Sequence, residues 1–299
     1  MSKPFSTPLS TRLGLRYPLV CAPMFIISNK EMLLACAEAG VLGAMPSLNS
    51  RTAEAFEADL QWLRHKTDKP FAINLTIGLT DPARLARDVE LCFENKVPVM
   101  ITSYGNPTEI VKHAHEHKVT VFHDVINMRH AKKAEQAGVD AIIGVSQGAG
   151  GHAGTVNPYV LIPHLKAQLS CPIIGAGCIG GGAQVAAALS LGAELAYMGT
   201  RFIASKECGA SDSYKQMVVD SSHNDVVYTD KVSGIHANFL KNTIPDQTEP
   251  DRGPAAAKRW KDIWSAGQGV TLISEVKSIE GIVEDVVREY HDAVSRLTA

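Results

Sequence analysis

The 299-residue sequence predicts an α/β fold, a (β/α)8 (TIM) barrel, and three observations favour it. Eight short apolar runs are each followed by a segment whose apolar residues have helical spacing. The runs alternate little with polar residues, which is typical of parallel strands buried on both faces. No GxGxxG follows the first run, as it usually does in a doubly wound open sheet, the competing fold. Eight such units close naturally into a barrel.

The predicted elements follow one another with short turns between them. The strands are PLVCAPM (18–24), LGAMP (42–46), PFAINLT (70–76), VPVMITSY (97–104), VTVFHDV (119–125), AIIGVSQ (141–147), PIIGAG (172–177) and LAYMGT (195–200). The helices between them are 30–39, 52–65, one that starts near Pro82, 108–117, 128–137, 158–169 and 182–191. Pro82 suits a first helical turn, where its missing N–H would be unpaired anyway. Gly138 and Gly192 are natural stops after their helices.

The alternation of strands and helices ends after residue 205. We expect residues 1–205 to form the barrel, 206–272 an insertion that acts as a lid over its mouth, and 273–299 a C-terminal helix packing on the barrel. A disordered linker is the alternative for 206–272, which is rich in polar residues, Gly and Pro. Phe239, Trp260 and Trp264 argue against it, because linkers seldom carry large aromatic residues.

The composition excludes several classes of partner. A formal net charge of −2 at pH 7 argues against nucleic acid and anionic membrane surfaces. No apolar run approaches the roughly 20 residues that span a bilayer, and the first 15 residues lack the apolar core of a signal peptide. The six cysteines are scattered without a CxxC pair, which favours reduced thiols in a cytoplasmic protein and no metal site. A homodimer is left open.

Glycine-rich ends follow the last two predicted strands, GAGCIGGG (175–182) and MGT (198–200). Glycines let backbone N–H groups approach an anion closely, and barrels often bind phosphate at this place. A plain strand-to-helix turn is the alternative. No lysine follows at P-loop spacing, which disfavours a nucleoside triphosphate. The sequence therefore predicts a phosphate site at the mouth of the barrel.

The residues after the first and third strands suit a flat ring attached to that phosphate. Ala22, Pro23 and Met24 form an apolar and fairly flat lining, and Asn74 offers amide hydrogen bonds. A flavin fits this lining better than a sugar does. Pyridoxal phosphate needs a Schiff-base lysine, and no lysine lies in the eight predicted strands. A phosphorylated substrate stays an alternative.

One histidine, His152, stands among small residues in SQGAGGHAG (146–154). Gly150, Gly151 and Gly154 would let the loop run close to a ligand and present only the imidazole. Histidine can exchange a proton near neutral pH, or stabilise developing negative charge when protonated. A loop histidine without a role is the alternative. His123, in FHDV, is a second and weaker candidate at the barrel mouth.

Four motifs together resemble the nitronate monooxygenases, formerly called 2-nitropropane dioxygenases. They are APM after strand one, NL after strand three, AGGHAG after strand six, and PIIGAGCIGGGAQVAAALSLGAELAYMGTRF. The resemblance runs from about residue 10 to 205, and resumes more weakly at GIHANFL (234–240) and WSAGQGV (264–270). It implies an FMN-dependent barrel that oxidises alkyl nitronates with O2 to a carbonyl compound and nitrite.

The resemblance also implies roles for particular residues. His152 would be the catalytic residue, placed near the nitro group as a base or charge stabiliser. Ser265 and Gln268 lie in a segment that approaches the active site in relatives, and would contact the substrate. The residues implied to bind FMN are Ala22, Pro23, Met24, Asn74, Asp124, Ala149, Gly150, Gly151, Gly175, Gly177, Cys178, Gly199 and Thr200.

Three departures from the family pattern put the substrate in doubt but leave FMN binding intact. Gly148 stands where the family often has Glu, and Cys178 where it usually has Gly. Asp124 stands where some relatives have a basic residue, and an acid near the flavin would disfavour its anionic forms. An NAD(P)H-dependent FMN reductase of quinones or enoyl thioesters is therefore an alternative, because FMN-type enoyl-acyl-carrier-protein reductases share AGGH-like and MGT motifs. No dinucleotide fingerprint is legible. A flavin- or phosphate-binding module without catalysis is a third interpretation.

Overall fold

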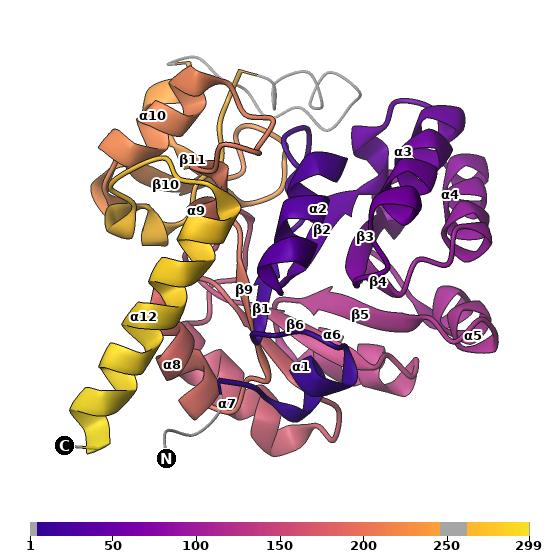
Figure 1. Ribbon diagram of the computed structural model, residues 1–299, viewed down its shortest axis with the longest axis horizontal. Coiled ribbons are helices and arrows are strands. Elements are labelled where there is room, and N and C mark those ends of the chain that lie inside the picture. Colours follow the sequence, from indigo (N-terminus) through magenta and orange to yellow (C-terminus); the bar gives the residue numbers. More distant parts are fainter. Residues whose placement is uncertain (1–4, 246–261, 299) are drawn as a thin grey trace.

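Eight parallel strands close into a barrel in the computed structural model, which describes residues 5–245 and 262–298 (Figure 1). The barrel closes where the last strand pairs with the first. The strands are β1 (Leu19–Cys21), β2 (Leu42–Pro46), β3 (Phe71–Thr76), β4 (Val99–Ser103), β5 (Thr120–Val125), β6 (Ala141–Val145), β8 (Ile173–Ala176) and β9 (Leu195–Met198). Each lies within one of the eight predicted runs, so the predicted fold class is confirmed.

Helices connect consecutive strands and cover the outside of the barrel (Figure 1). They are α2 (Lys30–Ala39), α3 (Ala53–Lys66), α4 (Pro82–Glu94), α5 (Thr108–Glu116), α6 (Met128–Gln136), α7 (Pro158–Gln168), α8 (Gly182–Ser190) and the short α9 (Thr200–Ile203). The first turns are fixed by capping side chains that accept a backbone N–H. These caps are Asn29, Thr52, Asp81, Asn127 and Asn157.

The core has two layers, one inside the barrel and one between the strands and the helices. The inner layer includes Val20, Ile101, Phe122 and Ile143, all fully buried. A short helix that the sequence did not predict, α1 (Pro8–Arg12), contributes Leu9 to this layer. The filled interior leaves the strands' C-terminal ends as the place for a site.

In the described residues after 205, the chain adds a small sheet, the helices α10 and α12 and three short 3-10 helices to the barrel. Its elements are α10 (Asp212–Asp220), η3 (His223–Asp225), β10 (Val226–Thr229), β11 (Ala237–Leu240), η4 (Lys241–Thr243), η5 (Gln268–Leu272) and α12 (Ile279–Thr298). β11 pairs on one side with β10 and on the other with β7 (Gly151–His152), in the loop after β6. We keep the division at residues 205 and 272 as a proposal; Trp260 lies outside the described residues. No helix in the described part of the chain is long and apolar enough to cross a membrane.

The C-terminal helix α12 is present as predicted and runs along α8 (Figure 1). The two helices meet at Gly182, where a Cβ atom would lie 2.1 Å from the carbonyl oxygen of Val286. Tyr290 of α12 stacks on Phe5 with ring centroids 3.8 Å apart. The close approach explains the glycine that begins α8, and it ties the last helix to the seventh strand–helix unit.

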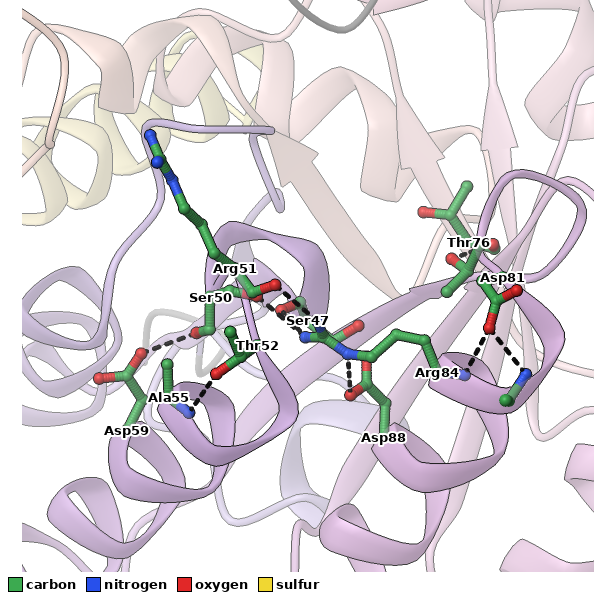
Figure 2. A network of polar contacts seen from close by, with 12 residues as sticks. Ser47, Ser50, Arg51, Thr52, Ala55, Asp59, Thr76, Asp81, Arg84 and Asp88 are labelled. Carbon is green, nitrogen blue, oxygen red and sulfur yellow. Dashed lines mark hydrogen bonds and ion pairs between the residues drawn. The ribbon is translucent and has the colours of Figure 1, made fainter. Parts of the chain in front are cut away.

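A half-buried arginine holds the loop after β2 against α4 (Figure 2). The Arg84 guanidinium donates to Asp88 Oδ1 at 2.7 Å and to the carbonyl oxygens of Ser50 at 2.9 Å and Arg51 at 3.0 Å. Asp88 is fully buried, and its Oδ2 has no partner among the described residues. This loop carries Leu48, which borders the cavity described below. The network therefore supports one wall of the site.

Replacing Arg84 with methionine is expected to lower the free energy of unfolding by about 3 kcal/mol, because it leaves the Asp88 carboxylate buried without its partner. Urea unfolding measures the change. The matched control is Arg87→Met on the same helix, whose exposed ion pairs with Glu57, Glu90 and Glu94 should contribute less than about 1 kcal/mol. Adding Asp88→Leu to Arg84→Met should restore part of the loss. Equal losses in the two single variants would contradict the assigned role.

Candidate active site

A cavity of about 1020 Å³ lies at the C-terminal ends of the barrel strands. That volume is at the upper end of the range of ligand pockets, about 300–1,000 Å³. Residues of the predicted site line it together with residues 263–265, 267 and 269 of the insertion. The predicted residues in its wall are Ala22, Pro23, Met24, Asn74, Asp124, Ala149, Gly150, Gly151, His152, Gly177, Cys178, Gly199, Thr200 and Ser265.

The loops after β8 and β9 form a cradle of backbone N–H groups. Gly177 and Cys178 have left-handed backbone conformations, with φ of 107° and 57°. The N–H groups of Cys178, Gly199 and Thr200 donate no hydrogen bond to any described residue. Thr200 Oγ1 accepts the N–H of Gly267 at 2.9 Å, which leaves its own proton for another acceptor. Converging N–H groups of this kind can bind an anion.

Polar side chains on β3, on β5 and in the insertion line other parts of the cavity wall. Asn74 on β3 donates from Nδ2 to Ile101 O at 3.1 Å and to Ser103 Oγ at 3.3 Å, which fixes its amide and leaves Oδ1 as the acceptor. Asp124 on β5 points inward, and its Oδ1 is buried without a partner among the described residues. Burial raises the pKa of Asp124 to about 7. Ser265 Oγ is likewise buried and unpartnered. Unpartnered buried polar atoms in a cavity wall point to a ligand that completes their hydrogen bonds.

His152 lies in the strand β7, and the insertion fixes its backbone. Ala237 of β11 pairs with it, and Tyr228 of β10 donates its hydroxyl to the carbonyl of Ala153 at 3.0 Å. The imidazole meets the ring of Tyr104 edge-on at a centroid distance of 5.2 Å, and Nε2 lies 3.4 Å from Ser233 Oγ. Burial lowers the pKa of His152 to about 4, so the imidazole is neutral at pH 7.

Two of the glycines before His152, Gly148 and Gly150, are explained by the close approach of the insertion. The carbonyl of Gly148 accepts the N–H of Gln268 at 2.9 Å. A Cβ atom on Gly150 would lie 2.9 Å from the backbone nitrogen of Gly267. Asn238 of β11 donates its side-chain amide to the carbonyl of Ala149 at 2.7 Å. The loop before His152 is therefore clamped between the barrel and two segments of the insertion.

Three predicted candidates lie elsewhere than expected. A Cβ on Gly175 would meet side chains of Ile162, Ala188 and Ala193, so this glycine serves packing against the helices rather than the cavity. Gln268 is exposed and contacts the Cys178 thiol at 3.7 Å, and it is absent from the cavity wall. His123 faces outward, because inward-facing Phe122 and Asp124 alternate with it along β5, and its Nδ1 lies 2.8 Å from Thr102 Oγ1.

The sequence analysis missed several aromatic and polar residues at the site. Tyr104, Tyr197 and Tyr214 line the cavity, and Ser233 contacts the histidine. Tyr104 directly follows β4 and is the last residue of the predicted strand 97–104, but it was not assigned to the site. Ser233 lies 81 residues after His152 and has no signal in the sequence. Among the described residues that line the cavity there is no lysine or arginine.

Comparisons with known proteins agree on a family. The family model described as nitronate monooxygenase matches residues 81–260. A probable nitronate monooxygenase of Staphylococcus saprophyticus subsp. saprophyticus is 26% identical, over 97% of this chain and 99% of that protein. A (3aS,4S,5R,7aS)-5-hydroxy-7a-methyl-1-oxo-octahydro-1H-indene-4-carboxyl-CoA dehydrogenase of Mycobacterium tuberculosis is 29% identical, over 85% and 72%. The structure of FabK from Thermotoga maritima has a TM-score of 0.87 and 31% identity, over 98% of both chains.

Proposed function

This chain belongs to the nitronate monooxygenase family, and from that premise we propose that it oxidises alkyl nitronates with O2 to a carbonyl compound and nitrite, with FMN as its cofactor. The observation that carries the proposal is one cavity that combines three features. They are the anion cradle, a flat apolar bed formed by Ala22, Pro23 and Met24, and the neutral imidazole of His152. An alkyl nitronate and O2 are the small molecules it would take.

The residues present fit FMN. The N–H groups of Cys178, Gly199 and Thr200 would hold the phosphate, and the Thr200 hydroxyl would add a donor. Ala22, Pro23 and Met24 would lie beside the ring system, while Asn74 Oδ1 would accept from its polar edge. The cradle contains no fixed positive charge among the described residues, so the phosphate would be bound by oriented backbone dipoles. When bound, FMN would accept one electron from the nitronate and pass it to O2.

His152 would act on the substrate as a neutral group. The Ser233 hydroxyl donates to the carbonyl of Ile235 at 3.1 Å, so its contact with His152 favours a proton on Nε2 and makes Nδ1 the basic nitrogen. When a nitroalkane binds, a neutral imidazole can remove the proton from the carbon next to its nitro group and so form the nitronate. Because the pKa of His152 is low, its imidazole would carry no positive charge before the substrate binds. The segments that clamp the His152 loop would also exclude water from the reacting atoms.

An NAD(P)H-dependent FMN reductase of quinones or enoyl thioesters is the second candidate. It is favoured by the likeness to FabK at 31% identity, and by a relative whose name denotes a carboxyl-CoA thioester as substrate. The same cradle and bed would serve either reaction. A cytoplasmic location also stays a proposal, supported by six cysteines that all carry free thiols.

We expect the purified protein to be yellow, or to bind added FMN, and its flavin to be bleached by propyl nitronate without oxygen. Stopped-flow absorbance would compare propyl nitronate with NADH and NADPH under the same conditions. Rapid bleaching by the nitronate alone supports the first candidate, because only a direct electron donor reduces the flavin. Rapid bleaching by NADH or NADPH alone would favour the reductase, and a colourless protein that binds no FMN would remove both.

A further inference from the structure

The cavity contains one group able to change charge near neutral pH. The ionisable side chains in its described wall are Tyr104, Asp124, His152, Cys178, Tyr197 and Tyr214. Burial raises the pKa of the tyrosines and of the thiol, and lowers that of the histidine to about 4. The three tyrosines, the Cys178 thiol and the His152 imidazole are therefore neutral at pH 7. The charge of the described wall consequently depends on the state of Asp124.

Asp124 has no partner that would favour its charged form. Its carboxyl makes no hydrogen bond or ion pair with any described residue, and Oδ1 is shielded from solvent. Tyr104 from β4 and Tyr197 from β9 are the titratable groups close enough to interact with it electrostatically. Tyr104 also contacts the ring of His152. On the outer side of β5, His130 of α6 acts on His123 instead.

The position of Asp124 places it against the ring end of a bound cofactor. In the order of strands around the barrel, β3 lies opposite β8, and β6 separates β5 from β8; because the cradle follows β8 and β9, both β3 and β5 lie on another side of the mouth. A cofactor held by its phosphate in the cradle must cross the mouth to reach this side. Asp124 and Asn74 both face the cavity there. A carboxylate at that place would stand unpaired beside a ligand that carries its own negative charge.

We propose that Asp124 is held as a neutral carboxylic acid in the working enzyme and donates its O–H to an acceptor atom on the ring of bound FMN. The inference rests on the proposed function for the identity of the ligand. In the neutral form the carboxyl has one donor, and that donor finds no acceptor within the described protein. An acceptor atom on the ligand would complete the hydrogen bond that the Asp124 O–H donates. The cavity would then hold an anionic cofactor without adding a second negative charge.

If Asp124 must be neutral to donate this hydrogen bond, FMN binds more weakly as pH rises. Burial raises the pKa of Asp124 to about 7, so the neutral form that binds is present below this pH and is lost above it. If only the neutral form donates, its population falls about tenfold between pH 6 and pH 8, and the FMN affinity falls with it. The anionic nitronate would be disfavoured in the same direction, because ionised Asp124 repels it.

Infrared difference spectroscopy of the protein tests the protonation state directly, with and without FMN. At about pH 6 ordinary aspartates are ionised, so wild type should show a carboxylic acid carbonyl band that Asp124→Asn lacks. Asp68→Asn, which removes an exposed carboxylate, should keep the band. If Asp124→Asn does not fold, wild type labelled with ¹³C-aspartate replaces it. A band that shifts with the label and disappears around pH 7 is then assigned to Asp124. Absence of any such aspartate band would overturn the proposal.

Quenching of FMN fluorescence on binding tests the contact with the cofactor. We expect the wild-type dissociation constant to rise about tenfold more between pH 6 and pH 8 than that of Asp124→Asn. The phosphate of FMN itself titrates near pH 6, and the comparison with the variant removes that contribution. If the FMN dissociation constants of wild type and Asp124→Asn depend on pH in the same way, the proposed contact between Asp124 and FMN is wrong. Complete failure of both proteins to bind FMN would instead refute the proposed function, while the infrared band would still report on Asp124.

Discussion

Replacing His152 with asparagine is expected to slow the turnover of nitroalkanes, which must first lose a proton to form the nitronate, by at least about tenfold, within a range that reaches 10²–10⁴ for lost acid–base catalysis. Asparagine keeps a polar side chain of similar length but cannot take up a proton. FMN binding should persist, because the cradle and the apolar bed follow β8, β9 and β1, whereas His152 lies in β7. Steady-state kinetics with nitropropane and the flavin absorbance of the purified variant measure the two properties.

His123→Asn is the matched control for this prediction. His123 is buried and His152 is half-buried, and desolvation lowers the pKa of each to about 4. Only His152 lines the cavity, whereas His123 faces Thr102 on the outer side of β5. A general consequence of removing a buried histidine would therefore appear in both variants. Turnover that falls equally in the two, or unchanged turnover in His152→Asn, would remove His152 from the mechanism.

Ser233→Ala separates orientation of the imidazole from its chemistry. The Ser233 hydroxyl is 3.4 Å from Nε2, and Tyr104 still meets the ring when it is removed. The expected loss in kcat is about fivefold or less, since a typical hydrogen bond contributes about 1 kcal/mol. A loss as large as that of His152→Asn would mean that the hydroxyl itself takes part in proton transfer.

The barrel could be predicted because each of its strands has a local signal. A strand buried on both faces must be an uninterrupted apolar run, and AIIGV and PIIGAG show this without ambiguity. The two-residue strand β7 has no such signal, since Gly151 and His152 are too few to show a period. It exists because β11 pairs with it across more than 80 positions of sequence, and such a pairing cannot be inferred from either segment alone.

The site could be predicted wherever residues lie near the C-terminal end of a barrel strand or follow it directly. Asn74, Asp124, Gly177 and Thr200 were found in this way, and all four line the cavity. Glycines were harder to assign, because the same residue type serves two purposes. Gly175 lies inside β8 and makes room for Ile162, whereas Gly150 makes room for the insertion. Only the three-dimensional neighbours of the missing Cβ atom distinguish these cases.

Replacing Gly267 with alanine is expected to weaken FMN binding by about 10- to 100-fold, the result of about 1–3 kcal/mol of overpacking. The new Cβ atom would lie 2.5 Å from the carbonyl oxygen of Gly148 and 2.7 Å from the nitrogen of Gly150. Both contacts are with backbone, so no side chain can rotate away. The insertion must then move, and the hydrogen bond from Gly267 to Thr200 Oγ1 in the cradle is lost with it. FMN fluorescence titration measures the affinity.

Gly269→Ala provides the comparison within the same segment. Its Cβ atom would meet Gly180 at 3.5 Å, an ordinary van der Waals distance, so FMN affinity should change less than about threefold. Cleavage of the insertion by a protease should accelerate in Gly267→Ala alone, because only there is the segment displaced from the His152 loop. Since one contact network joins Gly267 to both Thr200 and the His152 loop, the same variant should also lower kcat at saturating FMN. Weakened FMN binding with unchanged kcat would show that the insertion supports the cradle but does not position His152.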